Sequence, residues 1–399
     1  MYRTLQVLGP EHEFSVVDEK LQPLPIVDKI IKDMHGRIVN TVDLGRFSFG
    51  KELQAHVAEF KANVPFDSPE VFEETMNKGV QSIVDFLDKR YGARLLGLGM
   101  HPSLLLKDVE MWSHRDRQIY AALSRIFNLN QHGWLNIQSF QLNLPFKNEH
   151  EAIKLHNAIT NILPYLPAIT ASSPIYESKI GDYVDNRLFF YLKNQAEVPS
   201  ITGDIIPEYV NSFEEYEKVT VRQYSEDLTK FNAPRCLLNK EWVNSRGAVF
   251  RFDRKAIEIR IMDEQECVKS DVALSCFIRA VLRGIMQQKE DEFEYLPHHV
   301  LVSNLHAVIR DGLDAAVKHP KGSTARQVCT YLYRIAEENA SPEEKKYLGI
   351  VKRRIAEGNL SDLILKEVTK KALKTDLREA IFTVYSSLAY CLEENRVYS

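Results

Sequence analysis

The sequence predicts an α+β fold, in which a mostly antiparallel sheet is followed by a C-terminal helical region. The first two-thirds of the chain mix strand-like and helix-like segments without the regular strand–helix–strand alternation of a parallel sheet. From about residue 269 onward the pattern is helical nearly to the end. Because residues 269–295 contain no linker rich in Pro, Gly or Ser, we expect a sheet-based core at residues 1–268 and a helical region at residues 269–399, packed together as one continuous domain.

Alternation and helical periodicity place the expected elements along the chain. Residues 68–90 begin with Ser68 as N-cap and Pro69 at the first helical position, and they then keep a helical period. Residues 246–263 alternate in two runs and indicate a hairpin, whereas residues 172–210, rich in Ser, Gly, Asp and Pro, are expected to be mostly loop. Further helices are expected at residues 26–35 and 149–166, and further strands at residues 1–20 (a strand pair, or a strand and turn), 48–64, 94–102 and 134–146.

The composition is that of an ordinary globular protein and excludes several classes. Of the 399 residues, 44% are hydrophobic and 27% are charged, and the formal net charge of -4 lacks the basic footprint of a nucleic-acid binder. No apolar run approaches the roughly 18 residues of a membrane span, and the amino terminus turns polar and acidic too early for a signal peptide. The five cysteines are widely spaced and include no CxxC pair. We therefore expect a cytoplasmic protein with no nucleic-acid or membrane partner.

Two glutamates on the first strand point to a metal site. Glu11 and Glu13, in GPEHEF, are two residues apart and therefore share one face of a strand. Adjacent carboxylates repel each other, and burying them is costly unless a cation lies between them. From this motif alone, an edge strand with a solvated polar face is the simpler interpretation.

The second acidic strand contains a break in its alternation. In KELQAHVAEFKA, polar residues occupy alternate positions from Glu52 to His56, and the alternation slips by one at Val57-Ala58. A β-bulge at this point would return Glu59 to the face of Glu52 and His56. The alternative is that the strand simply ends at Val57.

Two further segments carry a polar row against an apolar row. Glu258 and Arg260 share one face of IEIRIMD, where arginine can neutralise a carboxylate or bind phosphate through two hydrogen bonds. An ordinary cross-strand salt bridge explains this pair equally well. Ser139, Gln141 and Asn143 share a face of IQSFQLNL and offer neutral oxygen donors that suit a hard cation, although alone they indicate only a polar sheet face.

Together these rows predict a sheet that lines an active cleft with one face and carries helices on the other. Hard oxygen ligands, with few histidines and no cysteine, favour Mg²⁺ or Mn²⁺ over zinc. Magnesium usually shares phosphate oxygens with a nucleotide, which predicts phosphoryl chemistry on ATP. The sequence contains no GxxxxGK[ST] or GxGxxG motif, which disfavours a P-loop, a kinase-type loop or a classical Rossmann site.

The ordered motifs resemble the glutamate–cysteine ligase family, in particular its carboxylate–amine ligase branch with a glutamine-synthetase-like fold. The matching segments are spread over nearly the whole chain, and their order and spacing carry the resemblance. They are GPEHEF; KELQAHVAEF, with the seven-residue step from Glu52 to Glu59; LPYLPAITASSPIYESKIGDYVDNRL, ending at Arg187; AIEIRIMD, with Glu258, Arg260 and Asp263; and NLHAVIRDGLDAAV, with Asn304 and Arg310.

The resemblance implies roles for individual residues. The expected metal ligands are Glu11, Glu13, Glu52, His56, Glu59, Gln141 and Glu258. Arg260 is expected to contact phosphate and, with Glu258, to be catalytic, and the expected substrate-binding residues are Arg187, Tyr183, Gln138 and Asn143. Relatives commonly carry histidine where this chain has Gln141, and often a second where it has Asn143, which weakens the expected third metal position. His56 would compensate as a ligand.

The implied activity is that of an ATP- and Mg²⁺-dependent carboxylate–amine ligase. Glutamate would be activated at its γ-carboxylate as an acyl phosphate, and an amine (cysteine, another amino acid or a polyamine) would attack it. Small-molecule amino acid and amine substrates are the expected partners, and the family is compatible with a homo-oligomer. Two alternatives remain: a catalytically weak nucleotide- and metal-binding regulatory protein of the same fold, and a guanidino kinase of the same superfamily.

Overall fold

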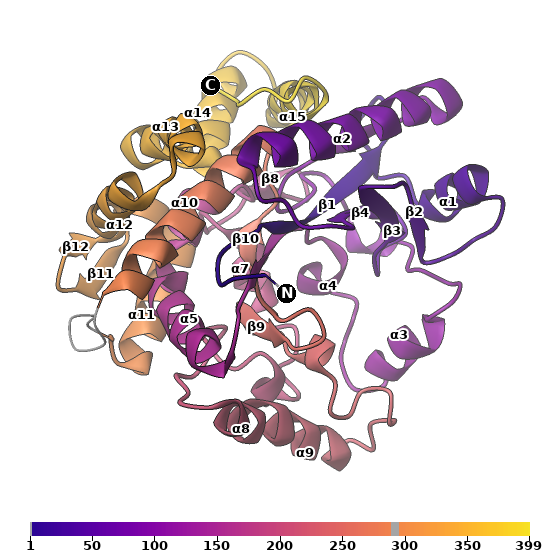
Figure 1. Ribbon diagram of the computed structural model, residues 1–399. Helices are drawn as coiled ribbons and strands as arrows, with labels where there is room; N and C mark the ends of the chain where they lie inside the picture. Colours follow the sequence, from indigo (N-terminus) through magenta and orange to yellow (C-terminus); the bar gives the residue numbers. More distant parts are fainter. Residues whose placement is uncertain (1, 289–294) are drawn as a thin grey trace.

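The computed structural model describes residues 2–288 and 295–399 and is built on an eight-stranded sheet in the order β2-β3-β4-β1-β6-β10-β9, with β5 paired to β1 (Figure 1). All of its strand pairs are antiparallel, which confirms the predicted α+β class. The strands are β1 (Gly9–Val17), β2 (Thr41–Asp43), β3 (Phe47–Lys51), β4 (Val57–Ala62), β5 (Arg94–Leu96), β6 (Ser139–Pro145), β9 (Ala248–Arg251) and β10 (Ala256–Asp263).

Helices surround this sheet, and two small hairpins lie outside it. The helices are α1 (Val27–His35), α2 (Pro69–Tyr91), α3 (Arg117–Leu123), α4 (His132–Leu135), α5 (Glu149–Ile162), α6 (Pro167–Thr170), α7 (Asn186–Tyr191), α8 (Phe213–Tyr216), α9 (Gln223–Lys230), α10 (Val268–Gln287), α11 (His298–Asp311), α12 (Ala325–Asn339), α13 (Pro342–Glu357), α14 (Leu360–Ala372) and α15 (Leu377–Glu393). The hairpins are β7 (Ile175–Tyr176) with β8 (Lys179–Ile180), and β11 (Ala316–His319) with β12 (Gly322–Thr324).

The main core lies between one face of the sheet and α10. Alternate residues of neighbouring strands supply it, as in the cross-strand pair of Leu142 on β6 and Ile259 on β10, both fully buried. Helix α10 contacts α2 and α5 as well as α12 and α13, so the helical region packs directly on the sheet-bearing part of the chain. The division at residue 268 remains a prediction.

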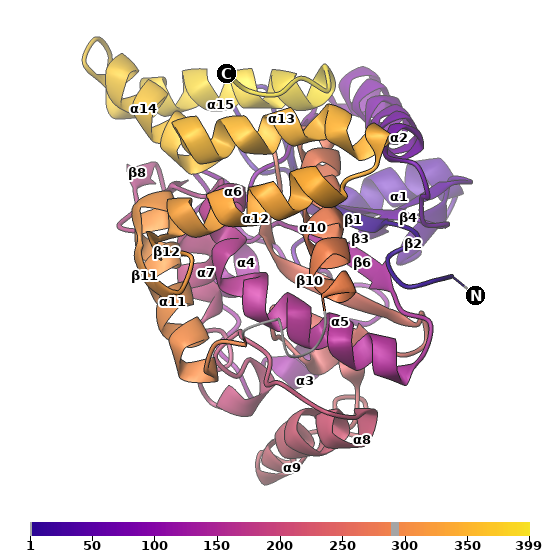
Figure 2. The ribbon, with the colours of Figure 1, turned by 60° about the vertical axis from the view of Figure 1, so that its left-hand side comes forward.

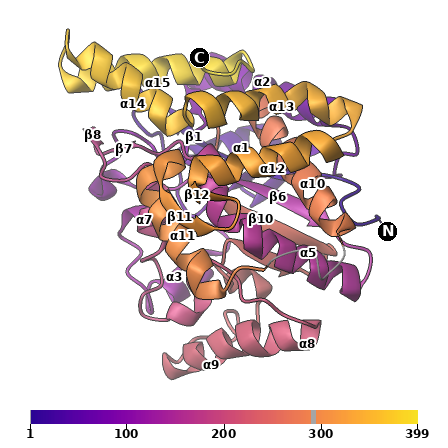
Figure 3. The ribbon, with the colours of Figure 1, turned by 90° about the vertical axis from the view of Figure 1, so that its left-hand side faces the viewer.

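Two smaller apolar clusters lie at opposite ends of the molecule. The first joins α14 and α15 to the ends of β1 and β5 through Val17, Leu96 and Leu98. The second, which we call the α3–α9 lobe, contains Leu123 and Phe127 with residues of α9 and of the loops around residues 198–201 and 237–243. Figures 1, 2 and 3 show α13–α15 stacked at one end and α8–α9 at the other. Within the described residues, no helix combines the length and apolarity needed to cross a bilayer.

The structure corrects the strand expected at residues 48–64. The chain forms two strands there, β3 and β4, which pair as a hairpin from Phe47↔Ala62 to Lys51↔Ala58. Residues 52–56 are the connection between them, and this connection lacks the Asn-Gly or Gly-Gly signature by which hairpin turns are recognised in sequences. The segment at 134–146 is also shorter as a strand than expected, because Trp134 lies in α4 and β6 begins at Ser139.

Candidate active site

The polar rows of β4, β1, β6 and β10 meet on the sheet face opposite the core. Glu13 on β1 lies directly across from Glu59 on β4, and Glu11 lies across from Gln141 on β6. Glu258 on β10 lies across from Asn143 on β6. Directly opposed residues of an antiparallel pair have Cβ atoms about 4.5–5.5 Å apart, so the register alone gathers these side chains into one site.

The local structure that brings Glu52 and Glu59 to this site differs from the predicted one. The bulge predicted at Val57-Ala58 does not occur, because the pairing of β3 with β4 runs without a register shift. Glu59 lies on β4 opposite Gly50, and Glu52 follows the end of β3. A hairpin therefore brings the two carboxylates to one place, and the slip in the sequence pattern marks the start of β4.

Three of these carboxylates have raised pKa values, because the neighbouring cations do not offset the effects of burial and of mutual repulsion. Burial and the carboxylate of Glu59 raise the pKa of Glu13 to about 7. Burial and the charge of Glu13 raise the pKa of Glu52 to about 7. Burial also raises the pKa of Glu59 well above its usual range, although the Lys61 ammonium lies 2.5 Å from its Oε1. A cluster that resists ionisation in this way is suited to bind a cation.

The other two acidic residues already form ion pairs with arginine. The Arg254 Nη1 lies 2.5 Å from Glu11 Oε1. Burial would raise the pKa of Glu11, but Lys61 and Arg254 outweigh it and lower this pKa to about 2. Glu258 is fully buried, with Arg251 Nε 2.6 Å from its Oε2.

The site also contains three cations that the sequence pattern did not predict: Lys61, Arg251 and Arg254. The signal for the last two was the basic turn of the predicted 246–263 hairpin, RFDRK. The signal for Lys61 was its position two residues after Glu59 on the same strand, which places both on one face.

The amides of β6 orient the carboxylates. Gln141 Nε2 donates to Glu13 Oε1 at 2.9 Å, and the Ser139 backbone N–H donates to Glu13 Oε2 at 2.7 Å. Asn143 Nδ2 donates to Glu11 Oε1 at 3.0 Å. The direct ligand role predicted for Gln141 stays a prediction, because this side chain presents its NH₂ group to Glu13.

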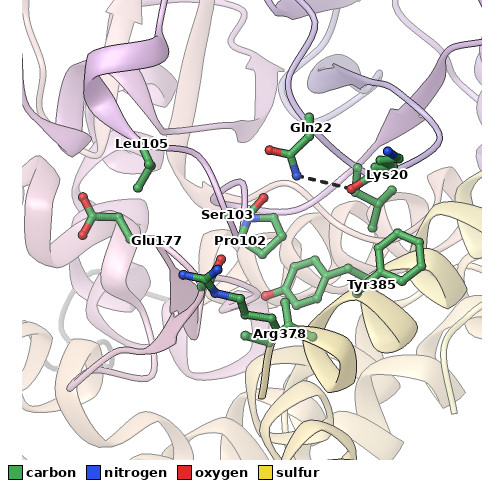
Figure 4. Close-up of a pocket in the computed structure, with 12 residues that line it drawn as sticks. Lys20, Gln22, Pro102, Ser103, Leu105, Glu177, Arg378 and Tyr385 are labelled. Atoms are coloured by element: carbon green, nitrogen blue, oxygen red, sulfur yellow. Dashed lines mark hydrogen bonds between the residues drawn. The ribbon is translucent and has the colours of Figure 1, made fainter. Parts of the chain in front are cut away.

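Two cavities open beside the carboxylates. The first has a volume of about 250 Å³, and its polar end is lined by Glu13, Glu52, Ser139, Gln141, Arg187 and Arg260. The second, of about 410 Å³, is lined by Glu11, Lys61, Arg254 and Asn143 together with apolar residues. We call them the arginine cavity and the lysine cavity. A third cavity, shown in Figure 4, contains Tyr385, Arg378 and Lys20 and none of the cluster carboxylates.

Two arginines project into the arginine cavity from rigid supports. The Arg260 Nη1 donates to the Asn244 carbonyl at 3.0 Å, and its Nε lies 3.4 Å from Glu258 Oε1. The Arg187 guanidinium donates to the carbonyls of Arg260 (3.1 Å), Ile261 (3.2 Å) and Met262 (3.0 Å), and it lies 3.5 Å from Asp263 Oδ1. These contacts hold positive charge opposite the carboxylate cluster.

Five predicted site residues line neither cavity. Two of them, Glu59 and Glu258, still belong to the carboxylate cluster, whereas the other three lie apart from it. His56 is buried in the β3–β4 connection, where burial and the neighbouring His101 lower its pKa to about 3. Tyr183 stacks on Phe189, with ring centroids 4.0 Å apart. Gln138 is one residue out of phase with the polar row that starts at Ser139, so strand alternation directs it away from that face. Their metal- and substrate-binding roles therefore remain predictions without support from the cleft.

A buried charged cluster behind β1 supports the carboxylate strand. His12 Nδ1 lies 3.3 Å from Glu264 Oε1 and 3.4 Å from Asp271 Oδ2. Glu264 Oε2 in turn accepts the backbone N–H of Glu13 at 2.9 Å. Burial would lower the pKa of His12, but Glu264 and Asp271 raise it to about 10. The sequence pattern could not reveal this cluster, because Asp271 arrives from α10.

The sheet is antiparallel, its polar face carries clustered glutamates and arginines, and helices pack on its other face. This architecture defines a glutamine-synthetase-like α+β protein. A solved structure with this fold is the glutamate–cysteine ligase of Francisella tularensis in complex with AMP. It is 14% identical, with a TM-score of 0.65, and the match covers 100% of this chain and 91% of that one. The predicted fold class is thereby confirmed.

The sequence comparisons agree with this class. The profile of glutamate–cysteine ligase family 2 (GCS2) matches residues 7–385, and the chain belongs to that family. A relative from Archaeoglobus fulgidus, described as an uncharacterized protein, is 47% identical over 98% of this chain and 100% of its own length. A relative from Rubrobacter xylanophilus, with the name "Putative glutamate--cysteine ligase 2-1", is 24% identical over 92% of this chain and 90% of its own length.

Proposed function

We propose that the protein is an ATP- and Mg²⁺-dependent carboxylate–amine ligase that activates the γ-carboxylate of glutamate as an acyl phosphate and joins it to an amine. The observation that carries this proposal is the cluster of Glu13, Glu52 and Glu59, whose pKa values are all raised. Two of its members, Glu13 and Glu52, line one cavity together with Arg187 and Arg260. Membership of the glutamate–cysteine ligase family supports it. The same family supports glutamate as the acylated substrate.

The donor set fits magnesium. All three cluster side chains offer hard carboxylate oxygens, and burial together with their mutual repulsion raises the pKa of each. Magnesium prefers such ligands and usually shares phosphate oxygens with a nucleotide. Glu13, Glu52 and Glu59 would hold Mg²⁺, which when bound offsets the negative charge of the phosphates. Glu11 and Glu258 would join as ligands by exchanging part of their contact with Arg254 and Arg251.

The chain's own residues supply positioning and charge. Arg260, held by the Asn244 carbonyl and Glu258, stabilises negative charge on the transferred phosphoryl group. Arg187, fixed by backbone carbonyls, attracts the carboxylate of the substrate amino acid. The incoming amine must lose a proton, and the carboxylates of the arginine cavity are the acceptors within reach.

The two cavities divide the substrates between them. The lysine cavity combines Lys61 and Arg254 with apolar walls such as Val7 and Pro145, which suits the phosphates and the base of a nucleotide. The arginine cavity suits the amino acid and the amine, because Arg187 lies within it. Glu13 and Glu52 border the arginine cavity and Glu11 borders the lysine cavity, so the γ-phosphoryl group would be transferred beside these carboxylates.

Hydroxylamine trapping tests this proposal directly. Purified protein, ATP, Mg²⁺ and glutamate should give γ-glutamyl hydroxamate and ADP in equal amounts when hydroxylamine is added, because hydroxylamine attacks an acyl phosphate without needing an acceptor pocket. Chelation of the metal with EDTA should stop the reaction. Failure to form ADP or hydroxamate over a broad range of conditions would contradict the ligase.

A matched pair of variants links that activity to the cluster. Glu13→Gln should lower turnover at least ~100-fold, because it replaces a charged ligand by a neutral amide and removes the acceptor oxygen of one of two hydrogen bonds, from the Ser139 N–H or from Gln141 Nε2. Glu19→Gln, on an exposed side chain of the turn after β1, should leave turnover unchanged. Equal activity of both variants would remove the cluster from the mechanism. Circular dichroism would confirm that Glu13→Gln is folded.

The hydrogen bonds of Gln141 and Asn143 favour one second candidate, a nucleotide- and metal-binding regulatory protein. The two amides donate to Glu13 and Glu11, at positions where the family resemblance leads us to expect histidine. Retained ATP binding by calorimetry without ADP release for any carboxylate and amine would favour that candidate. A product carrying phosphate on a guanidine, identified by mass, would instead indicate a guanidino kinase.

A further inference from the structure

We infer that the amine accepted by this enzyme carries a bulky apolar group, and preferably an aromatic ring, as in aromatic amino acids and arylalkylamines. This inference rests on the proposed ligase function. It comes from the end of the arginine cavity opposite the carboxylates, which we call the aromatic end. Five aromatic side chains line it: Tyr120, Phe127, Trp134, Tyr191 and Trp242.

Three of the five rings present no free polar atom: Phe127 has none, and those of Trp134 and Tyr191 are hydrogen-bonded to the protein. The Trp134 indole Nε1 donates to the Asn194 carbonyl at 3.0 Å. The Tyr191 hydroxyl donates to the Ser245 carbonyl at 3.0 Å. With these groups already engaged, the rings offer apolar surface to the cavity, and an apolar or aromatic group is the occupant that gains most from contact with them.

The amides beside the rings are largely engaged as well. Gln54 Nε2 donates to the Trp134 carbonyl at 2.8 Å, and Gln195 Nε2 donates to Ser245 Oγ at 2.9 Å. The Gln195 Oε1 atom in turn accepts from Thr202 Oγ1. Because these amide groups are already bonded within the protein, an apolar occupant displaces few hydrogen bonds at this end.

Polyamines and small amines fit this end poorly. The acidic residues that line the cavity, among the residues described, are Glu13 and Glu52, and both belong to its polar end. The distal ammonium of a polyamine would therefore lie among rings without a carboxylate partner, where cation–π attraction offsets only part of its lost hydration. A small amine would leave the aromatic surface in contact with water.

The adenine base is the other group that could stack on these rings. The lysine cavity, of about 410 Å³, has apolar walls that include Val7, Pro65 and Pro145. It also holds Lys61 and Arg254, whose charges suit the phosphates of a nucleotide. An adenine at the aromatic end would place its phosphates away from these two cations. We therefore assign the aromatic end to the amine.

The aromatic end is separate from the sheet that carries the chemistry. Tyr120 comes from α3, Trp134 from α4 and Tyr191 from α7, while Trp242 lies in a short 3-10 turn at Glu241–Val243. Trp242 is 39% exposed at the cavity. The α3–α9 lobe and its neighbouring loops can thus set the choice of amine while the sheet keeps the phosphoryl-transfer machinery.

A panel of amines tests the inference. Phenylalanine, phenethylamine, leucine, cysteine, alanine and putrescine would each be supplied with ATP, Mg²⁺ and glutamate, and amides would be quantified by mass. The better of the two aromatic compounds should show a kcat/KM at least ~10-fold above those of alanine, cysteine and putrescine. If hydroxamate forms but a small amine or putrescine matches the aromatic ones, the inference is wrong and the ligase stands. If neither hydroxamate nor ADP forms, both fail.

Variants of two exposed aromatic residues sharpen the test. Trp242→Ala should reduce the ratio of kcat/KM for the aromatic amine to that for alanine at least ~10-fold, because it removes a wall of the aromatic end. Phe231→Ala is the matched control, since Phe231 is 44% exposed and lies outside the cavity, and it should leave that ratio unchanged. An unchanged ratio in Trp242→Ala, together with a raised KM for ATP, would place adenine at the aromatic end and overturn the inference.

Discussion

Gly99 lies at the closest approach between the loop after β5 and the carboxylate of Asp263. A Cβ atom at this position would lie 2.3 Å from Asp263 Cγ, well inside van der Waals contact. Asp263 accepts the Ser172 backbone N–H at 2.8 Å and lies 3.5 Å from Arg187 Nη1. A methyl group at Gly99 would therefore disturb the support of a cleft arginine, although Gly99 itself lines neither cavity.

A pair of glycine substitutions tests this contact. Gly99→Ala should lower the free energy of unfolding by ~1–3 kcal/mol through overpacking, and it should raise the KM for glutamate because Arg187 is displaced. Gly349→Ala, inside α13 with nothing within 4 Å of the added Cβ, should be neutral or stabilising by up to ~1 kcal/mol. Denaturant titration and steady-state kinetics measure both. Equal effects of the two substitutions would contradict the role of Gly99.

At the scale of elements, Glu344 joins α10 to α13. Its fully buried carboxylate lies 2.6 Å from Arg279 Nε and 2.8 Å from Arg283 Nη1, and it accepts the Ser341 backbone N–H at 2.7 Å as part of a capping box. Burial would raise the pKa of Glu344, but the two arginines outweigh it and lower this pKa below its usual value. The ion pair is therefore formed at neutral pH.

Removing this charge should destabilise the protein in a pH-dependent way. Glu344→Gln should cost ~3–5 kcal/mol at pH 7, because two arginines lose a buried partner. Since the pKa of Glu344 is lowered on folding, its contribution is fully present above the unfolded value of about 4.3 and is lost as the pH falls through the folded value. The difference from wild type should shrink accordingly in acid.

Denaturant titrations at pH 7 and at pH 4 or below measure this difference. Glu343→Gln, on an exposed side chain one residue earlier, should change the free energy of unfolding by less than ~0.5 kcal/mol. A gap between Glu344→Gln and wild type that is constant with pH would show that the carboxylate charge is not what joins the two helices.

At the scale of the whole molecule, the sheet and the C-terminal helices share one core. Residues of β1, β6 and β10 belong to the same apolar cluster as residues of α10, α12 and α13. The Asp271 side chain of α10 also contacts His12 on β1 at 3.4 Å. We therefore expect residues 1–268 and 269–399 to unfold together.

The positions of the three tryptophans make this expectation measurable. Trp112, Trp134 and Trp242 all precede residue 269, so their fluorescence reports on the sheet-bearing part, while far-UV circular dichroism is dominated by the helices. The two signals should change at the same denaturant concentration, as in a cooperative transition. Two separated transitions would show that the helical region is an independent domain.

Local patterns predicted much of the site and part of the fold. Strand alternation placed Glu11 with Glu13, and Glu258 with Arg260, on a common face. In the structure, Glu11 and Glu13 pair with Lys61 and Glu59 of β4, and Arg260 Nε lies 3.4 Å from Glu258 Oε1. The same reasoning merged β3 and β4 into one strand, because a polar connection without Gly or Pro continues an alternating pattern. It also left out Lys61 and Arg254, whose role depends on which strand lies beside β1.

The sequence by itself determined the α+β class, the carboxylate rows and the family, because side-chain alternation and motif order are properties of neighbouring residues. Only the tertiary structure decided that Glu13 opposes Glu59, that His56 is buried away from the cleft and that the α3–α9 lobe adds an aromatic end to the arginine cavity. Those outcomes depend on strand register and on contacts between distant segments. They are set by how the whole apolar core packs, which no local pattern records.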